Sequence, residues 1–507
     1  MLHTSTPPTQ IAGVPCALYW FVGQYSPPPC AAMLSRSSDQ TLTDQLAGRF
    51  AERIRSRLLP PGSRLPSVRE CARRHEVSPY TVVAAYDQLQ AQGLIEARRH
   101  RGYFVREPRP EPVRSRHAAA PSPGPGRSSA PIDAATLIRG MLQRMPRRDG
   151  PPRNDPGLGV LPQSWLETSF LGAAVRRVTT STSLHALSLQ YGEPAGDALL
   201  RRALSHKLAD LDIRAEPSQI VTTVGATHAL DVICRTLLRP GDAVMVDEPG
   251  WAVEFGRLSQ MGMRILPVPR RPEGPDLAVM EAYCRAHAPK LFITVSVLHN
   301  PTGGNLSPHG AHRLLGLAEQ FGFHVVEDDT YGDLAPAHAT RLTALDGLRR
   351  TLYVSGFAKI LAPNWRVGYL VAAPELVERF IDTKLLTTLT TPSILEQALA
   401  HCLEQGQIRR HAERVRERLD TARSRSVQLA LAAGCRFAAE PQGLFGWVDT
   451  GVDTDRLAQR MMDEGYLLAP GSLFHAVRQP STLMRINFAS TQDAAVWEDF
   501  TRLRDSL

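Results

Sequence analysis

Lysine is rare in this chain, and one lysine stands where an amine could do covalent chemistry. The four lysines are at positions 207, 290, 359 and 384. Lys359 follows the apolar run Leu352–Val354, which we expect to be a strand, and Arg366 lies seven residues further on. A free lysine has a pKa of about 10.4, and burial beside another cation lowers it so that the neutral amine can attack an aldehyde. We therefore predict that Lys359 forms a Schiff base with an aldehyde cofactor, and that Arg366 binds its phosphate.

Polar side chains follow two other predicted strands. Asp328 and Tyr331 come after the strand predicted at His324–Glu327, and Asn300 follows the one predicted at Leu291–Val295. In α/β proteins, ligands bind at the carboxyl ends of the strands. A carboxylate there can keep a pyridine nitrogen protonated, which makes the ring an electron sink. We assign this role to Asp328, and contacts with the ring's phenolic oxygen to Tyr331 and Asn300.

Further residues would bind the ends and the face of such a ligand. Ala226 and Thr227 open a predicted helix after the strand Ile220–Val224, and free backbone N–H groups at a helix start bind anions. Trp251 could stack on the ring, and Arg485 could hold a substrate carboxylate with a bidentate fork. Each residue alone also fits an ordinary structural role, so the prediction depends on their order and spacing together.

This order resembles the fold-type I, class I/II aminotransferases over about residues 155–507. The resemblance implies pyridoxal 5′-phosphate as the cofactor, with Lys359 as the Schiff-base lysine. The family often has hydroxyl residues three positions and one position before the lysine, where this chain has Gly356 and Ala358. Ser355 could compensate at the phosphate. Apolar strands alternate with helical runs here, which predicts an α/β domain with a mostly parallel sheet and a small C-terminal α+β subdomain.

A smaller patterned unit precedes this domain, at residues 41–106. Leu42–Leu58 carries a helical stripe of apolar residues, Ser67 and Ser78 can cap two further helices, and Ile95–Val105 is typical of a bent strand pair. Two helices across a tight turn, followed by a basic hairpin, predict a winged helix-turn-helix that reads double-stranded DNA. The basic side chains predicted to neutralise DNA phosphates include Arg69, Arg99 and Arg101.

The same residues resemble the GntR family of transcription regulators. The run from Pro61 to Ile95, PGSRLPSVRECARRHEVSPYTVVAAYDQLQAQGLI, matches that family's pattern PGxRLPSxRxLAxxxxVSRxTVxxAYxxLxxxGL. The resemblance implies that Arg69, Ser78 and Thr81, with Gly102 at the wing tip, contact DNA. Tyr80 lies on the predicted outer face of the third helix. The family usually has arginine where this chain has Pro79, so we expect a different operator sequence.

Charge and composition agree with a basic DNA-binding domain followed by a larger domain of nearly neutral net charge. Residues 41–116 hold 15 Arg against 8 Asp and Glu, whereas residues 117–507 hold 42 basic and 41 acidic residues. Residues 107–153 form a predicted linker rich in Pro, Ala and Ser, and residues 1–40 a predicted disordered tail. The seven cysteines form no CxxC pair, so we predict no metal site and a reducing, cytoplasmic location. The apolar stretch 11–23 is shorter than the ~20 residues of a membrane span, so we predict no membrane association.

The whole chain after residue 40 resembles the MocR subgroup of regulators. This resemblance implies a domain-swapped homodimer, in which each reader domain packs on the other subunit's body. The function that we predict is transcription regulation controlled by an amino compound or by vitamin B6. The alternative is a pyridoxal-phosphate-dependent aminotransferase with a secondary DNA-binding domain, and weak transamination is compatible with both functions.

Overall fold

The structure is a computed structural model that describes residues 41–55, 59, 62–98, 102–106, 156–166, 169–336 and 338–507. The chain divides into two compact units, residues 1–125 and 126–507, which we call the small unit and the large unit. The predicted tail, at residues 1–40, and the predicted linker, at 107–153, lie outside the described residues. The domain boundaries expected from the sequence stay predictions.

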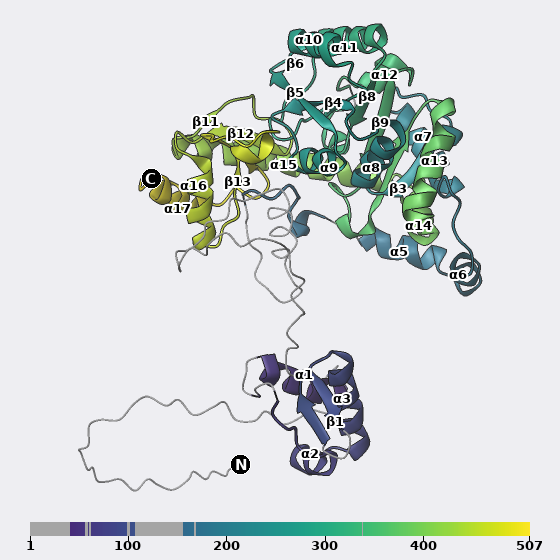
Figure 1. Cartoon of the computed structure of the whole chain (residues 1–507), viewed down its shortest axis with the longest axis vertical. Coiled ribbons are helices and arrows are strands. Elements are labelled where there is room, and N and C mark those ends of the chain that lie inside the picture. Colours follow the sequence, from purple (N-terminus) through teal and green to yellow (C-terminus); the bar gives the residue numbers. More distant parts are fainter. Residues whose placement is uncertain are drawn as a thin grey trace, which may run out of the picture. The chain divides into compact units, whose positions relative to one another are not determined.

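The small unit is a three-helix bundle with a two-stranded wing (Figure 1). Ser67 caps the second helix by accepting from the Glu70 N–H at 3.3 Å, and Ser78 caps the third by accepting from the Thr81 N–H at 3.0 Å. The buried face of the third helix consists of Val82, Ala85, Tyr86 and Leu89, which are all 0% exposed. The elements are α1 (Leu42–Arg55), α2 (Val68–His75), α3 (Pro79–Ala91), β1 (Ile95–Arg98) and β2 (Gly102–Val105).

An eight-stranded sheet in the order β3-β10-β9-β8-β7-β4-β5-β6 forms the centre of the large unit. The pairs within β5-β4-β7-β8-β9 are parallel, which confirms the predicted mostly parallel sheet. β10 runs antiparallel to both of its neighbours, because the short segment after β9 contains no crossover helix. The strands are β3 (Ile220–Val224), β4 (Ala243–Glu248), β5 (Arg264–Arg271), β6 (Gly274–Pro275), β7 (Leu291–Thr294), β8 (His324–Asp328), β9 (Thr351–Gly356) and β10 (Val367–Val371).

Helices cover both faces of this sheet. Buried residues of α8, α9 and α13 pack on one face, and those of α10 and α11 pack on the other, where Figure 1 shows the two helices together. The helices before residue 405 are α5 (Ser169–Val178), α6 (Ser181–Ser188), α7 (Ala198–Ala209), α8 (Ala226–Leu237), α9 (Ala252–Gln260), α10 (Leu277–His287), α11 (Pro308–Phe321), α12 (Leu342–Asp346), α13 (Pro374–Thr388) and α14 (Ser393–Glu404). Short 3-10 turns are η1 (Gln163–Trp165), η2 (Pro217–Gln219), η3 (Gly332–Leu334), η4 (Pro363–Trp365) and η5 (Gly471–Phe474).

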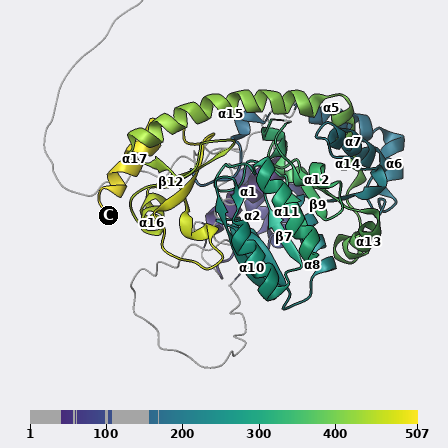
Figure 2. The same cartoon turned by 90° about the horizontal axis from the view of Figure 1, so that it is seen from above.

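The C-terminal subdomain has the predicted α+β composition. The long helix α15 runs from the side of α5 to α17, as Figure 2 shows. A four-stranded antiparallel sheet follows in the order β11-β12-β14-β13. Its elements are α15 (Gln407–Ala432), β11 (Arg436–Phe437), β12 (Phe445–Asp449), α16 (Thr454–Asp463), β13 (Ala469–Pro470), β14 (Leu483–Asn487) and α17 (Ala494–Arg504). Among the described residues, the helices are all too short or too polar to cross a membrane.

Candidate cofactor and DNA-binding sites

The predicted cofactor residues lie at the carboxyl ends of neighbouring strands in the large unit. Asn300 follows β7, Asp328 ends β8 and Lys359 follows β9. Parallel strands bring their carboxyl ends to one edge of the sheet. The segment between β9 and β10 returns the chain to the start of α8, so the lysine and the helix N-terminus belong to the same edge.

Lys359 is partly buried and close to two positive charges. Its Nζ donates to the Gly159 carbonyl oxygen at 2.9 Å and lies 5.5 Å from the centre of the Tyr331 ring. Burial, together with the charges of Arg485 and Arg366, lowers the pKa of Lys359 to about 8 against the opposing pull of Asp328. This is the amine that the sequence predicted, although the larger cationic contribution comes from Arg485 and not from Arg366.

A pH dependence of cofactor capture follows from this pKa. Only the neutral amine attacks an aldehyde, so the rate of pyridoxal phosphate capture by cofactor-free protein should rise between pH 6.5 and 9, with a midpoint near 8. Rapid-mixing absorbance at a series of pH values measures this rate. The control is a blocked lysine in solution, whose midpoint should lie near ~10.4. A rate that is flat or falls over this range would contradict the assignment.

Asp328 is a buried carboxylate with a fixed orientation. Its Oδ1 accepts from the Thr330 N–H at 3.1 Å and from the Thr330 hydroxyl at 2.5 Å. Burial, with a smaller contribution from the charge of Glu254, raises the pKa of Asp328 to about 6 against the hydrogen bonds from Thr330. Asp328 lines a pocket together with Trp251 and Asn300. A carboxylate of this kind is suited to sharing a proton with a basic ring nitrogen.

Arg485, Asn300 and Tyr331 form a hydrogen-bonded chain. Arg485 Nη1 donates to Asn300 Oδ1 at 2.8 Å, and Asn300 Nδ2 donates to the Tyr331 hydroxyl oxygen at 3.5 Å. The Arg485 guanidinium is 5% exposed, lies 4.4 Å from the Phe445 ring centre, and its buried Nε has no hydrogen-bond partner. Burial lowers the pKa of Arg485 to about 10. A buried cation with an unused donor fits an anionic ligand group such as a carboxylate.

Residues 156–160 cross this site, and we call them the strap. Arg485 Nη2 donates to the Gly157 carbonyl at 2.7 Å, in addition to the bond from Lys359 to Gly159. The Asn487 side chain holds the strap by donating to the Leu158 and Val160 carbonyls at 2.8 and 2.7 Å. Sequence reasoning missed the strap. Its two glycines were the available signal, because a Cβ on Gly157 would lie 2.4 Å from the backbone of Leu468.

The start of α8 is a candidate phosphate site. Gly225 caps the helix with φ 77°, and Arg366 Nη2 donates to the Val224 carbonyl at 3.1 Å. A Cβ on Gly225 would lie 2.4 Å from Arg366 Nη2, and a Cβ on Gly368 would lie 2.6 Å from the Ala226 nitrogen. Side chains at these positions would fill the space where helix N–H groups and a guanidinium converge. These residues therefore fit a phosphate, and Thr227 is exposed in the same turn.

Ser355 is not brought to this phosphate site. Gly356 faces the α8 side of β9, where its Cβ would lie 3.4 Å from the Ala226 nitrogen. Side chains alternate along a strand, so Ser355 faces the other side and donates to the Asp329 carbonyl at 3.0 Å. The expectation that Ser355 compensates for the missing hydroxyl residues therefore finds no support in its placement. Arg366 and the glycine-lined helix start are the groups present at this point.

Among the predicted DNA-contacting residues that the structure describes, Thr81 is half-buried and the others are exposed. Arg69 is exposed on α2, and Tyr80 on α3 is 82% exposed. The Ser78 and Thr81 hydroxyls lie 2.8 Å apart at the start of α3, where Ser78 also acts as the cap. Gly102 has φ 95° and opens the second strand of the wing. Arg99 and Arg101 lie outside the described residues.

We expect Arg69→Ala to weaken DNA binding without changing the sequence preference. One lost phosphate contact should reduce the slope of log affinity against log salt by about 0.9. Fluorescence anisotropy with labelled DNA at several salt concentrations measures this slope. Arg285→Ala removes an exposed arginine of the large unit and is the matched control. An unchanged slope would contradict a phosphate contact at Arg69.

Comparisons with known families divide the chain as its fold does. The family described as aminotransferase class I and II matches residues 173–499. The family described as bacterial regulatory proteins, gntR family, matches residues 42–105. The first match covers the central sheet and most of the C-terminal subdomain, and the second covers the helix-turn-helix and its wing.

Individual relatives carry both parts or the larger part alone. The HTH-type transcriptional regulator YdcR of Escherichia coli is 30% identical over 88% of this chain and 94% of its own. The regulator TauR of Rhodobacter capsulatus is 29% identical over 94% of this chain and 98% of its own. Among solved structures, the kynurenine aminotransferase of Pyrococcus horikoshii is 25% identical, with a TM-score of 0.65 over 73% of this chain and 93% of its own.

Fold and site thus define a transcription regulator in which a helix-turn-helix DNA-binding domain precedes an aminotransferase-like domain. The chain belongs to the class I and II aminotransferase family and has the MocR architecture of regulators with a gntR-type domain. Family membership indicates pyridoxal phosphate as the cofactor, and the residues described above fit it.

Proposed function

We propose that this regulator senses an amino compound through pyridoxal phosphate held at Lys359. One observation supports this proposal most: an amine of lowered pKa, a buried carboxylate, a glycine-lined helix start and a guanidinium with an unused donor all belong to one site. Each of these groups matches a different part of a phosphorylated aldehyde cofactor or of an amino acid.

Each residue would have a distinct task toward the cofactor. When bound, pyridoxal phosphate supplies an aldehyde that bonds reversibly to amines and a pyridine ring that withdraws electrons. The Lys359 amine would hold the aldehyde carbon, and Asp328 would hold the proton at the ring nitrogen. Asn300 and Tyr331 would donate to the phenolic oxygen. The remaining contacts would come from Trp251 on the ring face, and from Ala226, Thr227 and Arg366 at the phosphate.

The strap offers a route from this site toward the DNA-binding domain. A ligand carboxylate at Arg485 would compete with the Gly157 carbonyl, which that guanidinium now binds at 2.7 Å. The bond from Lys359 to Gly159 depends on the free amine, so a cofactor bonded there would weaken it. In the sequence, residues 107–155 connect the strap to the small unit. A ligand that binds more tightly when the strap is in one position than in another would shift the DNA-binding equilibrium, and the size of the shift is set by that difference in affinity.

A titration of DNA affinity tests the proposed function. The protein is mixed with DNA from upstream of its own gene, with and without pyridoxal phosphate, and with a panel of amines, while keto acid formation is followed in parallel. We expect DNA affinity to change with an amine only when the cofactor is present. Rapid turnover with no sequence-selective binding would favour the aminotransferase instead. A response to pyridoxal phosphate alone would favour a sensor of the cofactor.

We further propose that the regulator acts as a homodimer in the cytoplasm, where its DNA lies. Apolar side chains gather near the end of α13: Leu386 is 90% exposed, Leu389 51%, and Leu189 and Tyr191 69% and 82%. A Cβ on Gly192 would lie 3.0 Å from the Thr391 carbonyl, so the two segments are neighbours. A monomer seldom exposes such a patch. The domain-swapped arrangement implied by the MocR resemblance is part of this proposal.

We expect Leu386→Asp to shift the protein from dimer toward monomer. A charge introduced into an apolar interface is costly to desolvate. Light scattering after size-exclusion chromatography measures the mass in solution. Leu345→Asp changes a leucine that is 55% exposed on α12 and is the matched control. A dimer that is unaffected by Leu386→Asp would place the interface elsewhere.

A further inference from the structure

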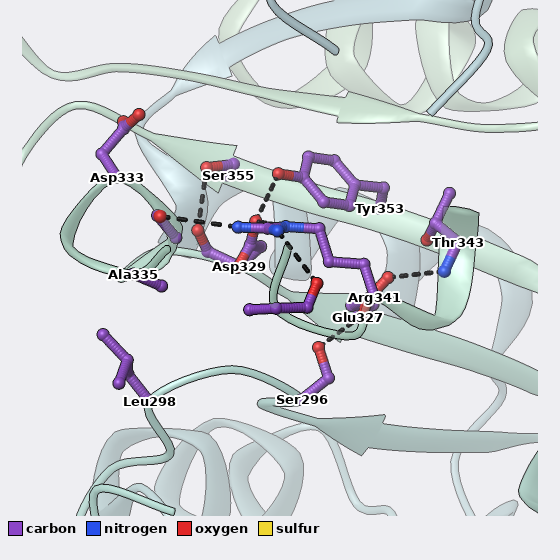
Figure 3. Close-up of polar contacts among 12 residues, drawn as sticks. Ser296, Leu298, Glu327, Asp329, Asp333, Ala335, Arg341, Thr343, Tyr353 and Ser355 are labelled. Carbon is purple, nitrogen blue, oxygen red and sulfur yellow. Dashed lines mark hydrogen bonds and ion pairs between the residues drawn. The ribbon is translucent and has the colours of Figure 1, made fainter. Parts of the chain in front are cut away.

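Three consecutive carboxylates lie at the end of β8 and directly after it, at positions 327–329, and the alternation of side chains along the chain separates them. Asp328 points toward Trp251 and the α8 side of the sheet. Glu327 and Asp329 point toward the opposite side, where they enter the buried polar cluster drawn in Figure 3. Glu327 is 0% exposed and Asp329 1%. None of the roles assigned above to the cofactor residues uses these two carboxylates.

Glu327 connects β8 to the segment that carries Asn300. It accepts from the Ser296 hydroxyl, and Ser296 lies four residues before Asn300. It also accepts from the backbone N–H groups of Leu342 and Thr343, at 2.7 and 2.8 Å, at the start of α12. A carboxylate with three donors holds its neighbours in one arrangement. The turn before Asn300 is therefore tied to the strand that ends in Asp328.

Asp329 connects the same strand to β9, which leads to Lys359. Its Oδ2 accepts from Arg341 Nε at 2.8 Å and from the Tyr353 hydroxyl at 2.7 Å. Its backbone carbonyl accepts from the Ser355 hydroxyl, four residues before the lysine. Asp329 therefore contacts two residues of β9, Tyr353 and Ser355, close to the end of the strand that precedes Lys359.

Arg341 is the cation in this cluster that pairs with Asp329. Its side chain is 1% exposed, and besides Asp329 it donates to the Ala339 carbonyl at 3.2 Å and the Gly332 carbonyl at 3.5 Å. Burial and the Asp329 carboxylate raise the pKa of Glu327. Without the Arg341 guanidinium, the negative charges of Glu327 and Asp329 would be buried with no cation to compensate them. These charges lie beside the turn that follows Asp328.

We propose that Glu327, Asp329 and Arg341 are positioning residues for the cofactor site. They hold the three segments that carry Asn300, Asp328 and Lys359 at fixed distances from one another. The inference rests on the proposed function, because the segments they hold are those assigned to pyridoxal phosphate. The ring contacts need alignment of all three segments, and small displacements of reacting groups have large effects.

Two variants and a matched control test this role. Arg341→Met removes the cation, and Tyr353→Phe removes only the hydroxyl that donates to the same Asp329 oxygen. Arg349→Met makes the same change at an arginine whose side chain is 74% exposed. The measurements are the affinity for pyridoxal phosphate by absorbance titration, the pH titration of the bound cofactor's absorption, and thermal unfolding.

We expect Arg341→Met to weaken pyridoxal phosphate binding by about tenfold or more and to shift the pH midpoint of the absorption. Tyr353→Phe should weaken binding by about threefold, the loss expected from one hydrogen bond, and Arg349→Met should change neither property. A merely structural cluster would lower the unfolding temperature but leave affinity and pH midpoint unchanged, and that result overturns the inference.

The remaining outcomes are also decisive. If Arg341→Met does not fold, Tyr353→Phe decides: wild-type affinity and wild-type absorption in that variant overturn the inference. A wild-type protein that binds no pyridoxal phosphate overturns the proposed function itself. A wild-type protein that binds it, with both cluster variants unaffected, overturns only the positioning role.

Discussion

Lys359→Ala is expected to abolish covalent retention of pyridoxal phosphate. The amine is partly buried, its pKa is lowered to about 8, and it points toward the strap at the carboxyl edge of the sheet. A cofactor held by phosphate and ring contacts alone is lost on dilution more readily than one that is also bonded to a lysine. Absorbance after gel filtration should therefore show the bound cofactor in the wild type and none in the variant.

A matched control separates this effect from loss of lysine in general. Lys290 is an exposed lysine of the large unit, so Lys290→Ala should retain the cofactor as the wild type does. Retention of the absorption band in Lys359→Ala would contradict the assignment. Loss of the band in both variants would point to unfolding, which circular dichroism of the same samples would detect.

Arg485→Leu is expected to remove the preference for amino acids over the corresponding decarboxylated amines. Arg485 is 5% exposed, and its buried Nε has no hydrogen-bond partner. A charge-assisted contact of this kind contributes about 2–3 kcal/mol, or a factor of about 30 to 160 in affinity. Spectral titration of the cofactor-loaded protein with matched pairs of amino acid and amine measures the ratio of affinities.

Using a ratio protects this test from indirect effects. Arg485 also donates to Asn300, so its loss should weaken cofactor binding as well. That weakening affects both members of each pair and cancels in the ratio. A ratio that does not change in Arg485→Leu would show that the carboxylate, if present, binds elsewhere.

Local sequence patterns predicted the strands of the sheet well, whereas the roles of the cofactor residues stay predictions. The strand predicted at Ile220–Val224 is found at those bounds as β3, and the strands predicted at Leu291–Val295 and His324–Glu327 are β7 and β8, each with one end shifted by a single residue. These elements have apolar runs or clear capping signals, so neighbouring residues are enough to define them. A motif that directly follows such a strand must lie at the strand's carboxyl end, so predicting the strand also predicts where the motif lies.

Features that depend on contacts between distant segments could not be predicted. The strap reaches Lys359 across 200 residues of sequence and Arg485 across 328, and an irregular segment has no periodicity to reveal this. The face on which Ser355 lies depends on its register opposite Tyr369. The cluster around Arg341 also required the structure, because a buried arginine has no local sequence signal.

The most direct test of the account is to locate the covalent bond. Protein incubated with pyridoxal phosphate is reduced with borohydride, digested and analysed by peptide mass spectrometry. We expect the cofactor's mass on the peptide that contains Lys359, and we expect this addition to disappear in Lys359→Ala. An addition found instead at Lys207, Lys290 or Lys384, or at no lysine, would contradict the proposed site.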